Sequence, residues 1–257
     1  AFRAYYAYPP SLTLADGFMI NAIYGFLTMF FSAVEQFKPT HLMICFDRKE
    51  PTFRHEQYKE YKAHRPPAPE EFILQMQRLK QALTDFGIQY VEKPGFEADD
   101  LMGTFAANFA NDCEHIYLFT GDHDAFQLVT DTVNVIMPKK GVSEFMIYKP
   151  SDVFDRYQVT PAQMVDFKAL KGDTSDNIPG VKGVGDKTAA KLISEFNTVA
   201  AIYDNLDRVT NIKLKDKLLT DKENALISYD LAQIDCAVPL EQGFNDFITQ
   251  LNWSIIQ

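Results

Sequence analysis

The chain has 257 residues, of which 46% are hydrophobic and 23% are charged, and its formal net charge at pH 7 is −10. This composition excludes a disordered chain and is sufficient for one large hydrophobic core or two smaller ones. The negative net charge argues against a general nucleic-acid binder, but it leaves room for a local basic patch.

The sequence shows no signals for export, membrane insertion or disulfide formation. No apolar run reaches the length of a membrane span, and the N-terminal AFRAYYAYPP has neither the basic start nor the apolar stretch of a signal peptide. Cys45, Cys113 and Cys236 are far apart and odd in number, which favours core positions over a disulfide framework or a thiolate zinc site. We therefore expect a cytoplasmic protein that does not enter a membrane.

Short strands and helices alternate in the first half of the chain. Runs of apolar, β-branched or aromatic residues predict strands at residues 41–46, 88–93, 115–121 and 133–138. Helical periodicity predicts helices at about residues 21–37, 70–86 and 97–110. This order predicts an α/β fold with a mainly parallel sheet and helices on both of its faces.

A basic and aromatic segment follows the first predicted strand. RKEPTFRHEQYKEYKAHR, residues 48–65, contains six Lys or Arg residues and three Glu, with Phe53, Tyr58 and Tyr61 between them. Two interpretations stay open. The segment is either a solvated helix face of mixed charge or a surface that holds phosphates and stacks an unpaired base.

Acidic residues follow three of the predicted strands. They are Asp47, Glu97, Asp99, Asp100, Asp122 and Asp124. Because the carboxyl ends of parallel strands meet at one edge of a sheet, we expect these side chains to converge there. Each cluster alone is also typical of a helix cap or a turn, and Asp99 and Asp100 suit the first turn of the helix at 97–110.

The spacing within two acidic clusters suggests how their side chains point. In GDHD an extended backbone would direct Asp122 and Asp124 to one side and His123 to the other. In KGDTSDN, Asp173 and Asp176 are three positions apart, which matches one face of a helical turn.

Eight carboxylates gathered without matching Lys or Arg residues would repel one another, so the cluster needs cations or bound protons. Oxygen ligands without a set of Cys or His residues suit Mg²⁺ or Mn²⁺. Two such ions about 4 Å apart would activate water and stabilise the leaving oxygen of a phosphoryl displacement. The acidic pattern therefore predicts hydrolysis of a phosphodiester.

From about residue 151 onwards the strand signals disappear. Helical patterns occur in SDVFDRYQ, TPAQMVDFKALKG, DKTAAKLISEF and DKENALISYDLAQI. We expect Ser151 and Thr160 to cap the first two helices, with Pro161 at the first position of the second. The boundary between the two predicted regions then divides the chain into residues 1–156 and 157–257.

A glycine-rich loop precedes one of these helices in GVKGVGDKTAAKLI, residues 180–193. Gly183 and Gly185 flank Val184, so backbone N–H groups there can approach a DNA phosphate, with Lys182 and Lys187 adding positive charge. A tight turn between two helices would explain the glycines equally well.

Several segments together carry a family resemblance. They are FRAYYA, NAIYGF, TFRHEQYKEYKAHR, GFEADD, GDHDAFQLV and GDTSDNIPGVKGVGDKTA. In this order, over about residues 2–240, they resemble the 5′-nuclease domain of bacterial DNA polymerase I, in the flap endonuclease and 5′–3′ exonuclease superfamily. The resemblance implies a PIN-like nuclease fold followed by a helix-two-turn-helix region, a helix-hairpin-helix variant that grips duplex DNA and often holds K⁺.

The resemblance also implies roles for individual residues. Metal ligands or their water shell would come from Asp47, Glu97, Asp99, Asp100, Asp122, Asp124, Asp173 and Asp176. Tyr61, Lys62 and Arg65 match the helical arch, at about residues 48–72, through which a 5′ flap passes, and Lys62 is similar to a basic catalytic residue. Arg3 matches an arginine near the active site.

The residues expected to contact DNA are Arg54, Lys182, Gly183, Val184, Gly185, Lys187 and Thr188. Val181 and Val184 lie in the segment that resembles the potassium loop. The resemblance further implies a strand before FRAYYA with a metal-binding Asp, so we expect the chain as given to be truncated, with weakened metal binding and stability.

We therefore expect a two-metal, structure-specific 5′ nuclease that uses Mg²⁺ or Mn²⁺ and removes 5′ flaps or RNA primers in DNA replication and repair. The expected partners are DNA with a 5′ flap or a nick, an RNA primer paired with DNA, and a polymerase domain later in the same full-length protein. The expected setting is a monomer associated with the bacterial nucleoid. A DNA-junction-binding module without catalysis is the alternative, and a phosphatase or RNA-cleaving PIN domain is a third interpretation.

Overall fold

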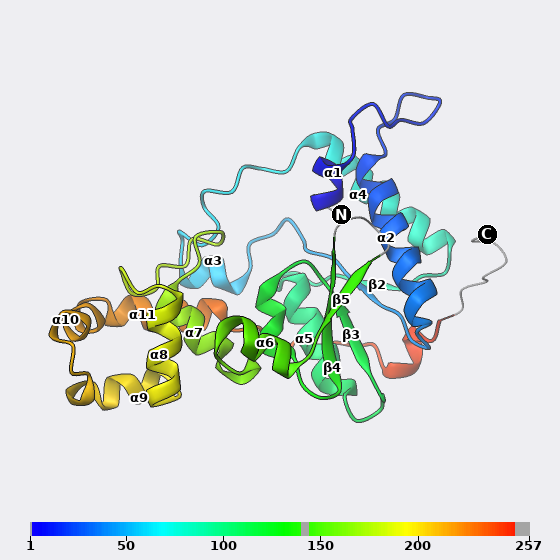
Figure 1. Cartoon of the computed structure of the whole chain (residues 1–257). Coiled ribbons are helices and arrows are strands. Elements are labelled where there is room, and N and C mark those ends of the chain that lie inside the picture. Colours follow the sequence, from blue (N-terminus) through cyan, green and yellow to red (C-terminus); the bar gives the residue numbers. More distant parts are fainter. Residues whose placement is uncertain (1, 140–143, 250–257) are drawn as a thin grey trace.

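The computed structural model describes residues 2–139 and 144–249. Within these residues an α/β region comes first and a helical region follows, beside it in space (Figure 1). Residues 250–257 of the second predicted region lie outside the described part of the chain. Among the helices that the structure describes, none combines the length and the apolar character needed to cross a bilayer.

The strands form two separate sheets. β1 (Ile44–Cys45) pairs in parallel with β2 (Tyr90–Val91), and β3 (Ile116–Phe119) pairs in parallel with β4 (Val133–Pro138). β5 (Phe145–Tyr148) completes the second sheet as an antiparallel neighbour of β4. The four predicted strands are confirmed in position, although β1 and β2 are short. The prediction missed β5, and it expected one sheet where the structure has two.

Helices cover both faces of the β1–β2 sheet. Ile44 and Tyr90, which are partners in the ladder, face α2 (Asn21–Phe37) and α4 (Glu70–Asp85). The next pair along the ladder faces α5 (Ala98–Phe109), because successive residues of a strand point to opposite faces. These three helices confirm the predictions at 21–37, 70–86 and 97–110.

The N-terminal helix α1 (Phe2–Ala7) lies against α2. The contact is close because Gly25 has no side chain: a Cβ there would come within 2.6 Å of the Cβ atom of Ala4. Glycine at this position therefore lets the two helices approach, and α1 brings Arg3 to the end of β3.

The basic segment after β1 contains little helix. α3 (Phe53–Gln57) has five residues, and residues 59–65 then form turns and a bend before α4 begins. Within the expected arch at 48–72, only α3 and the first residues of α4 are helical.

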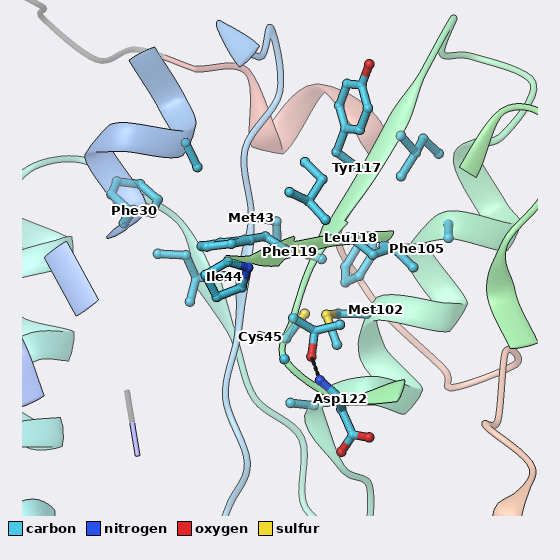
Figure 2. A pocket seen from close by; sticks show the side chains of 18 of the residues that line it. Phe30, Met43, Ile44, Cys45, Met102, Phe105, Tyr117, Leu118, Phe119 and Asp122 are labelled. Carbon is cyan, nitrogen blue, oxygen red and sulfur yellow. Dashed lines mark hydrogen bonds between the residues drawn. The ribbon is translucent and has the colours of Figure 1, made fainter. Parts of the chain in front are cut away.

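A cavity of about 1660 Å³ separates the two sheets. Ile44 and Cys45 of β1, and Leu118 and Phe119 of β3, line it, together with apolar side chains of α2 and α5 (Figure 2). Among the described residues β1 pairs only with β2, and β3 pairs only with β4. Both strands therefore have an edge without a ladder partner beside the cavity.

After β5 the described residues form helices, turns and isolated bridges. The helices are α6 (Pro150–Tyr157), α7 (Met164–Lys171), α8 (Asp186–Phe196), α9 (Val199–Asp204), α10 (Ile212–Thr220) and α11 (Lys222–Ala232). Short 3₁₀ helices in this part are η2 (Pro161–Gln163), η3 (Leu206–Arg208) and η4 (Phe244–Phe247), while η1 (His123–Leu128) lies earlier, between β3 and β4. α7 is the centre of this region, because all its residues except Lys171 are buried.

The four helical patterns of the second half are confirmed, whereas α9 and α10 were not predicted. Ser151 is not the cap of α6, because the helix already begins at Pro150 and Lys149 precedes it. The prediction at Thr160 is correct: it precedes η2, and its N–H donates to Oε1 of Gln163 at 3.1 Å.

Candidate active site

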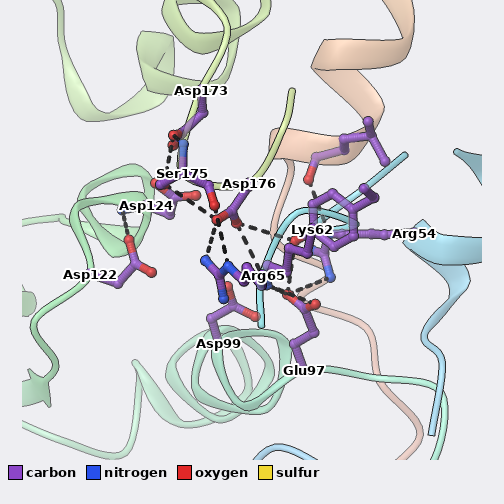
Figure 3. Close-up of polar contacts among 12 residues, drawn as sticks. Arg54, Lys62, Arg65, Glu97, Asp99, Asp122, Asp124, Asp173, Ser175 and Asp176 are labelled. Carbon is purple, nitrogen blue, oxygen red and sulfur yellow. Dashed lines mark hydrogen bonds and ion pairs between the residues drawn. The ribbon is translucent and has the colours of Figure 1, made fainter. Parts of the chain in front are cut away.

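The acidic clusters lie at the C-terminal ends of β1, β2 and β3, where each strand continues into a loop. Asp47 follows β1 by two residues and accepts a hydrogen bond from the N–H of Ala98, at 2.9 Å, with Oδ1. Asp122 follows β3 by three residues and precedes η1. The carboxylates of the later clusters lie around the same region (Figure 3). The structure thus brings acids from distant parts of the sequence to one end of the α/β region.

The beginning of α5 combines capping with ion pairing. Glu97 is the residue before the helix, and its N–H donates to Oδ2 of Asp100 at 3.0 Å. Asp99 lies in the first turn and accepts the N–H of Asp100, at 2.8 Å, with Oδ1. The capping interpretation is therefore correct for Asp100, and it coexists with the ionic contacts of this cluster.

Arg54 is fully engaged inside the protein. Its guanidinium donates to both carboxylate oxygens of Asp100, at 2.7 and 2.8 Å, and to the backbone oxygens of Leu231 and Gln233. Only 2% of Arg54 is exposed. This burial does not fit the DNA contact expected from the sequence, because the donors of Arg54 already have partners and a phosphate cannot reach them.

The turn after α3 places cations on two of the acids. Lys62 Nζ lies 2.9 Å from both oxygens of Glu97 and 3.6 Å from Oδ2 of Asp176. Arg65 pairs with Asp176 and donates to the carbonyl oxygen of Ser175 at 3.2 Å. Lys62 and Arg65 therefore face the acidic cluster, whereas Arg48, Lys49 and Lys59 are exposed, as the interpretation of a solvated face expected.

The backbone fixes this turn against the loop after α7. Lys62 adopts a left-handed conformation, with φ of 54°, and its N–H donates to the carbonyl oxygen of Asp176 at 2.9 Å. Tyr61 is buried, and its hydroxyl donates to Glu97 at 3.1 Å. Burial, with Glu97 and Asp176 nearby, raises the pKa of Tyr61, so the hydroxyl stays protonated as a hydrogen-bond donor.

The GDHD segment is not extended, so the prediction of alternating directions is wrong. Oδ1 of Asp122 accepts the N–H of Asp124 at 3.0 Å, which starts the 3₁₀ helix η1. The ring of His123 bonds to the hydroxyl of Tyr157 at 2.9 Å. Asp124 instead forms an ion pair with Lys168.

Asp173 and Asp176 lie in a turn closed by a bridge between Asp173 and Ile178, so the predicted helical turn is also wrong. Asp173 accepts hydrogen bonds from the N–H of Ser175 at 2.8 Å and from its hydroxyl at 2.6 Å. Lys168 Nζ lies 2.7 Å from Oδ2 of Asp173. Although burial opposes ionisation, Lys168 and Ser175 lower the pKa of Asp173 to about 2.

The expectation that the acids lack matching cations is wrong. Five of the eight carboxylates form ion pairs with basic side chains of the protein: Glu97, Asp100, Asp124, Asp173 and Asp176. The sequence did not reveal these pairs, because Lys168 and Asp124 are 44 positions apart and Arg54 and Asp100 are 46 apart. Lys168 and Ser175 are the site residues that the sequence analysis missed.

Three carboxylates stand apart from these pairs. Within residues 2–139 and 144–249, no Lys, Arg or His forms an ion pair with Asp47, Asp99 or Asp122. Burial and the neighbouring carboxylates of Glu97 and Asp100 raise the pKa of Asp99 to about 8. Asp99 therefore binds a proton at neutral pH in the absence of a bound cation.

The donor chemistry of the cluster fits a hard cation, because all the converging ligands are carboxylate oxygens. Their arrangement is nevertheless not a complete metal-binding site. The described residues contain no group of three or more Asp, Glu, His or Cys side chains placed to hold an ion. Side-chain cations balance most of the acids instead.

Arg3 lies at the end of β3, where its Nη2 donates to the carbonyl oxygen of Gly121 at 2.6 Å. A Cβ on Gly121 would come within 2.7 Å of the guanidinium, so the glycine makes room for this arginine. The structure thereby places Arg3 against Gly121, the residue that precedes Asp122 in the sequence.

The glycine-rich loop forms an exposed approach to α8. Val181 and Val184 are buried, whereas Lys182, Gly183, Gly185 and Lys187 are exposed and Thr188 is half-buried. Gly183 has φ of 77°, and Lys217 donates to its carbonyl oxygen at 3.2 Å. A Cβ on Gly185 would meet no atom of the described chain within 4 Å. The interior of the protein therefore does not explain the glycine at position 185.

Both regions match models of one protein family. Residues 1–158 match the family described as 5′-3′ exonuclease, N-terminal resolvase-like domain, and residues 159–253 match 5′-3′ exonuclease, C-terminal SAM fold. The chain therefore belongs to the 5′-3′ exonuclease family.

Curated relatives include DNA polymerase I of Mycobacterium bovis, 42% identical over 243 residues, which are 94% of this chain and 27% of the relative. DNA polymerase I of Bacillus subtilis is 41% identical over 253 residues, which cover 95% of this chain and 29% of the relative. The chain thus spans less than a third of the length of these relatives.

Solved structures show the same fold. T5 5′-exonuclease with bound divalent metal ions (zinc) has a TM-score of 0.72 at 23% identity, over 91% of this chain and 85% of that chain. The T5 D15 flap endonuclease in a pseudo-enzyme-product complex with DNA and metal ions has a TM-score of 0.69 at 23% identity, over 84% and 80%. The catalytic core of Rad2 in complex with DNA substrate has a TM-score of 0.57 at 17% identity, over 95% and 81%.

Proposed function

We propose that this chain is a divalent-metal-dependent, structure-specific 5′ nuclease that hydrolyses phosphodiester bonds of 5′ flaps and primers. The observation that carries the proposal is the convergence of carboxylates from three segments, around Glu97, Asp122 and Asp173, at one end of the α/β region, with Lys62 and Arg65 directly against them. Acids that would hold divalent ions, beside cations that would face a phosphate, suit hydrolysis of a phosphodiester. Membership of the 5′-3′ exonuclease family supports the same reaction.

Mg²⁺ or Mn²⁺ would be held by the acids at this edge. One group comprises Asp47, Glu97, Asp99, Asp100 and Asp122, and the other comprises Asp122, Asp124, Asp173 and Asp176. When bound, two ions supply an activated water and stabilise charge on the leaving oxygen. Asp100 contributes less directly than the others, because Arg54 and two backbone N–H groups already occupy its oxygens.

The protein's own cations would position the scissile phosphate. The side chains of Lys62 and Arg65 would exchange partners, because each holds a carboxylate that an ion can take over. Once released, their charged heads face the phosphate, and Arg3 approaches from the end of β3. Tyr61 anchors the turn through its hydroxyl contact with Glu97.

The glycine loop would grip the duplex part of the substrate. Gly183 and Gly185 let the backbone approach a phosphate, Lys182 and Lys187 add charge, and Thr188 lies within the first turn of α8. Val181 and Val184 are the positions where a K⁺ ion would be held, through backbone oxygens. Because these contacts address phosphates, recognition would depend on DNA shape and not on sequence.

The proposed substrates are DNA with a 5′ flap or a nick and an RNA primer paired with DNA, in replication and repair. The T5 and Rad2 neighbours in complexes with DNA support a DNA substrate. The bacterial DNA polymerase I relatives support a polymerase domain in the same full-length protein. We propose that this protein acts at the nucleoid in the cytoplasm. We propose that the chain acts as a monomer.

The test is cleavage of a 5′-labelled flap duplex with Mg²⁺, with and without EDTA. We expect cutting near the flap junction that EDTA abolishes and that Asp122→Asn lowers by several orders of magnitude. Asp131→Asn, at an exposed position before β4, is the matched control and should cleave normally. Lys62→Ala should still bind the flap but cut it roughly 10²–10³-fold more slowly. Salt-sensitive binding without any cutting would instead favour the non-catalytic junction-binding module.

A further inference from the structure

Lys168 is a buried lysine whose charged end lies between two acids of the candidate site. It belongs to the last turn of α7, and only 9% of the residue is exposed. Its Nζ atom forms ion pairs with Asp124 of η1 and with Asp173 of the loop after α7. The ammonium group thus joins two carboxylates from different elements.

The carboxylate of Asp173 and the backbone of Asp124 have anchors that do not depend on Lys168. Oδ1 of Asp173 is held by the hydroxyl and the N–H of Ser175, at 2.6 and 2.8 Å. The backbone of Asp124 is held by Oδ1 of Asp122, at 3.0 Å. The remaining oxygens, Oδ1 of Asp124 and Oδ2 of Asp173, are directed to the point that Nζ occupies. If the ammonium left, Ser175 would keep the Asp173 carboxylate in place, and the Asp124 carboxylate would lose its counter-charge and be available to another cation.

A lysine suits this position better than an arginine if the charge must leave. Its ammonium is a compact charge on a flexible four-carbon stem, whereas a guanidinium holds carboxylates with a rigid, two-pronged geometry. Arg54 is an example of the rigid geometry, because it forms a bidentate ion pair with Asp100 in the interior. The side chain of Lys168 makes one contact with each of two acids and no other hydrogen bond within the described residues.

We propose that Lys168 is an internal counter-cation that holds the place of one divalent ion and must move away before that ion binds. This inference rests on the proposed metal-dependent function. According to this inference, the acidic end of the α/β region has two parts that differ in their affinity for divalent ions. Ions bind more readily beside Asp47, Asp99 and Asp122, which lack an ionic partner in the described residues, whereas an ion between Asp124 and Asp173 has to exchange with the lysine.

The first experiment measures Mn²⁺ binding to the 257-residue chain by the loss of the free Mn²⁺ electron paramagnetic resonance signal. Lys168→Met keeps the length of the stem and removes the charge. We expect its weaker binding step to become tighter by tenfold or more. Lys171→Met is the matched control, because Lys171 lies on the same helix but pairs with Asp186 at 2.8 Å, away from these acids. It should bind Mn²⁺ like the unmodified chain.

The second experiment needs no variant, so it decides the matter even if Lys168→Met fails to fold. Acetylation of lysine amines is followed by mass spectrometry with and without saturating Mg²⁺. We expect the labelling rate of Lys168 to rise at least fivefold when Mg²⁺ is bound, while the rate of Lys171 stays the same. The magnesium-dependent change reports directly on the displacement of the ammonium group.

Two results would overturn the inference. If Lys168 stays protected with Mg²⁺ bound and Lys168→Met binds Mn²⁺ no more tightly, the lysine is not a placeholder, and flap cleavage by the unmodified chain would show that the proposed function stands. If neither the unmodified chain nor the variants bind a divalent ion, the inference fails together with the proposed function.

Discussion

Arg54 and Asp100 form a bidentate ion pair in the protein interior, with Nη1 2.8 Å from Oδ2 and Nη2 2.7 Å from Oδ1. The guanidinium also donates to backbone oxygens of Leu231 and Gln233, at the end of α11. One side chain therefore connects α3, the start of α5 and the C-terminal end of α11.

Arg54→Met should destabilise the protein strongly, because it leaves the Asp100 carboxylate buried without its partner. We expect a loss of about 3–5 kcal/mol in the free energy of unfolding, measured by urea denaturation. Arg48→Met is the control, because Arg48 pairs with Glu50 at the surface, and its midpoint should not change. The double variant Arg54→Met/Asp100→Leu should recover part of the loss, and a stable single variant would contradict the assigned role.

The pKa of Asp99 predicts how the stability of the metal-free protein depends on pH. Its value of about 8 lies above the ordinary value of 3.8, so the folded state binds more protons than the unfolded state between these values. Stability should therefore fall as the pH rises from about 4 to about 8, by up to about 1.4 kcal/mol per pH unit.

Thermal melting in EDTA across this pH range measures the effect. Asp99→Asn mimics the protonated form and cannot ionise, so it should reduce the slope while the protein stays folded. An unchanged slope in Asp99→Asn would assign the pH dependence to other groups.

The two glycines Gly180 and Gly185 should respond differently to substitution. Gly180→Ala should lower the melting temperature, because φ is 61° and the added Cβ would lie 2.3 Å from the backbone nitrogen of Gly172. Gly185→Leu should leave the melting temperature unchanged, because the position is open. It should nevertheless weaken binding to duplex DNA at least tenfold, by keeping a phosphate away from the backbone. Normal binding by Gly185→Leu would exclude this loop as a phosphate contact.

The fold was largely predictable where apolar patterns are local and long. The 3.6-residue period of α2 and the Asp-Lys-Thr start of α8 suffice to place both helices. β5 was missed because FMIY is short and its partner is the antiparallel edge of β4. The division into two sheets was not visible, because no local pattern reports which strand edges are unpaired.

The candidate site was predictable as a set of acids but not as a set of contacts. Strand ends and motif resemblance identified the carboxylates, since both depend on sequence order. Their counter-cations come from elements that are adjacent only after folding, as Lys168 and Asp124 show. The backbone also changed the expected side-chain directions. Because η1 begins directly after Asp122, the segment is not extended, and its side chains do not alternate as expected.

The cavity between β1 and β3 predicts that an added strand would stabilise the protein. An N-terminal extension with apolar residues that pairs with both free edges should raise the melting temperature by at least about 10 °C, because it buries several apolar side chains. It should also tighten Mn²⁺ binding if it ends in Asp. A scrambled polar extension of the same length is the control, and equal melting temperatures for both would refute the prediction.

The division between the two sheets also affects how firmly the acidic edge is held. Asp47 belongs to the loop after β1 and Asp122 to the loop after β3, and no ladder of backbone hydrogen bonds joins these strands within the described residues. Side-chain packing around α5 sets their separation instead. Such packing is more compliant than a continuous ladder, so we expect the gap between the two carboxylates to change with the charge that lies between them.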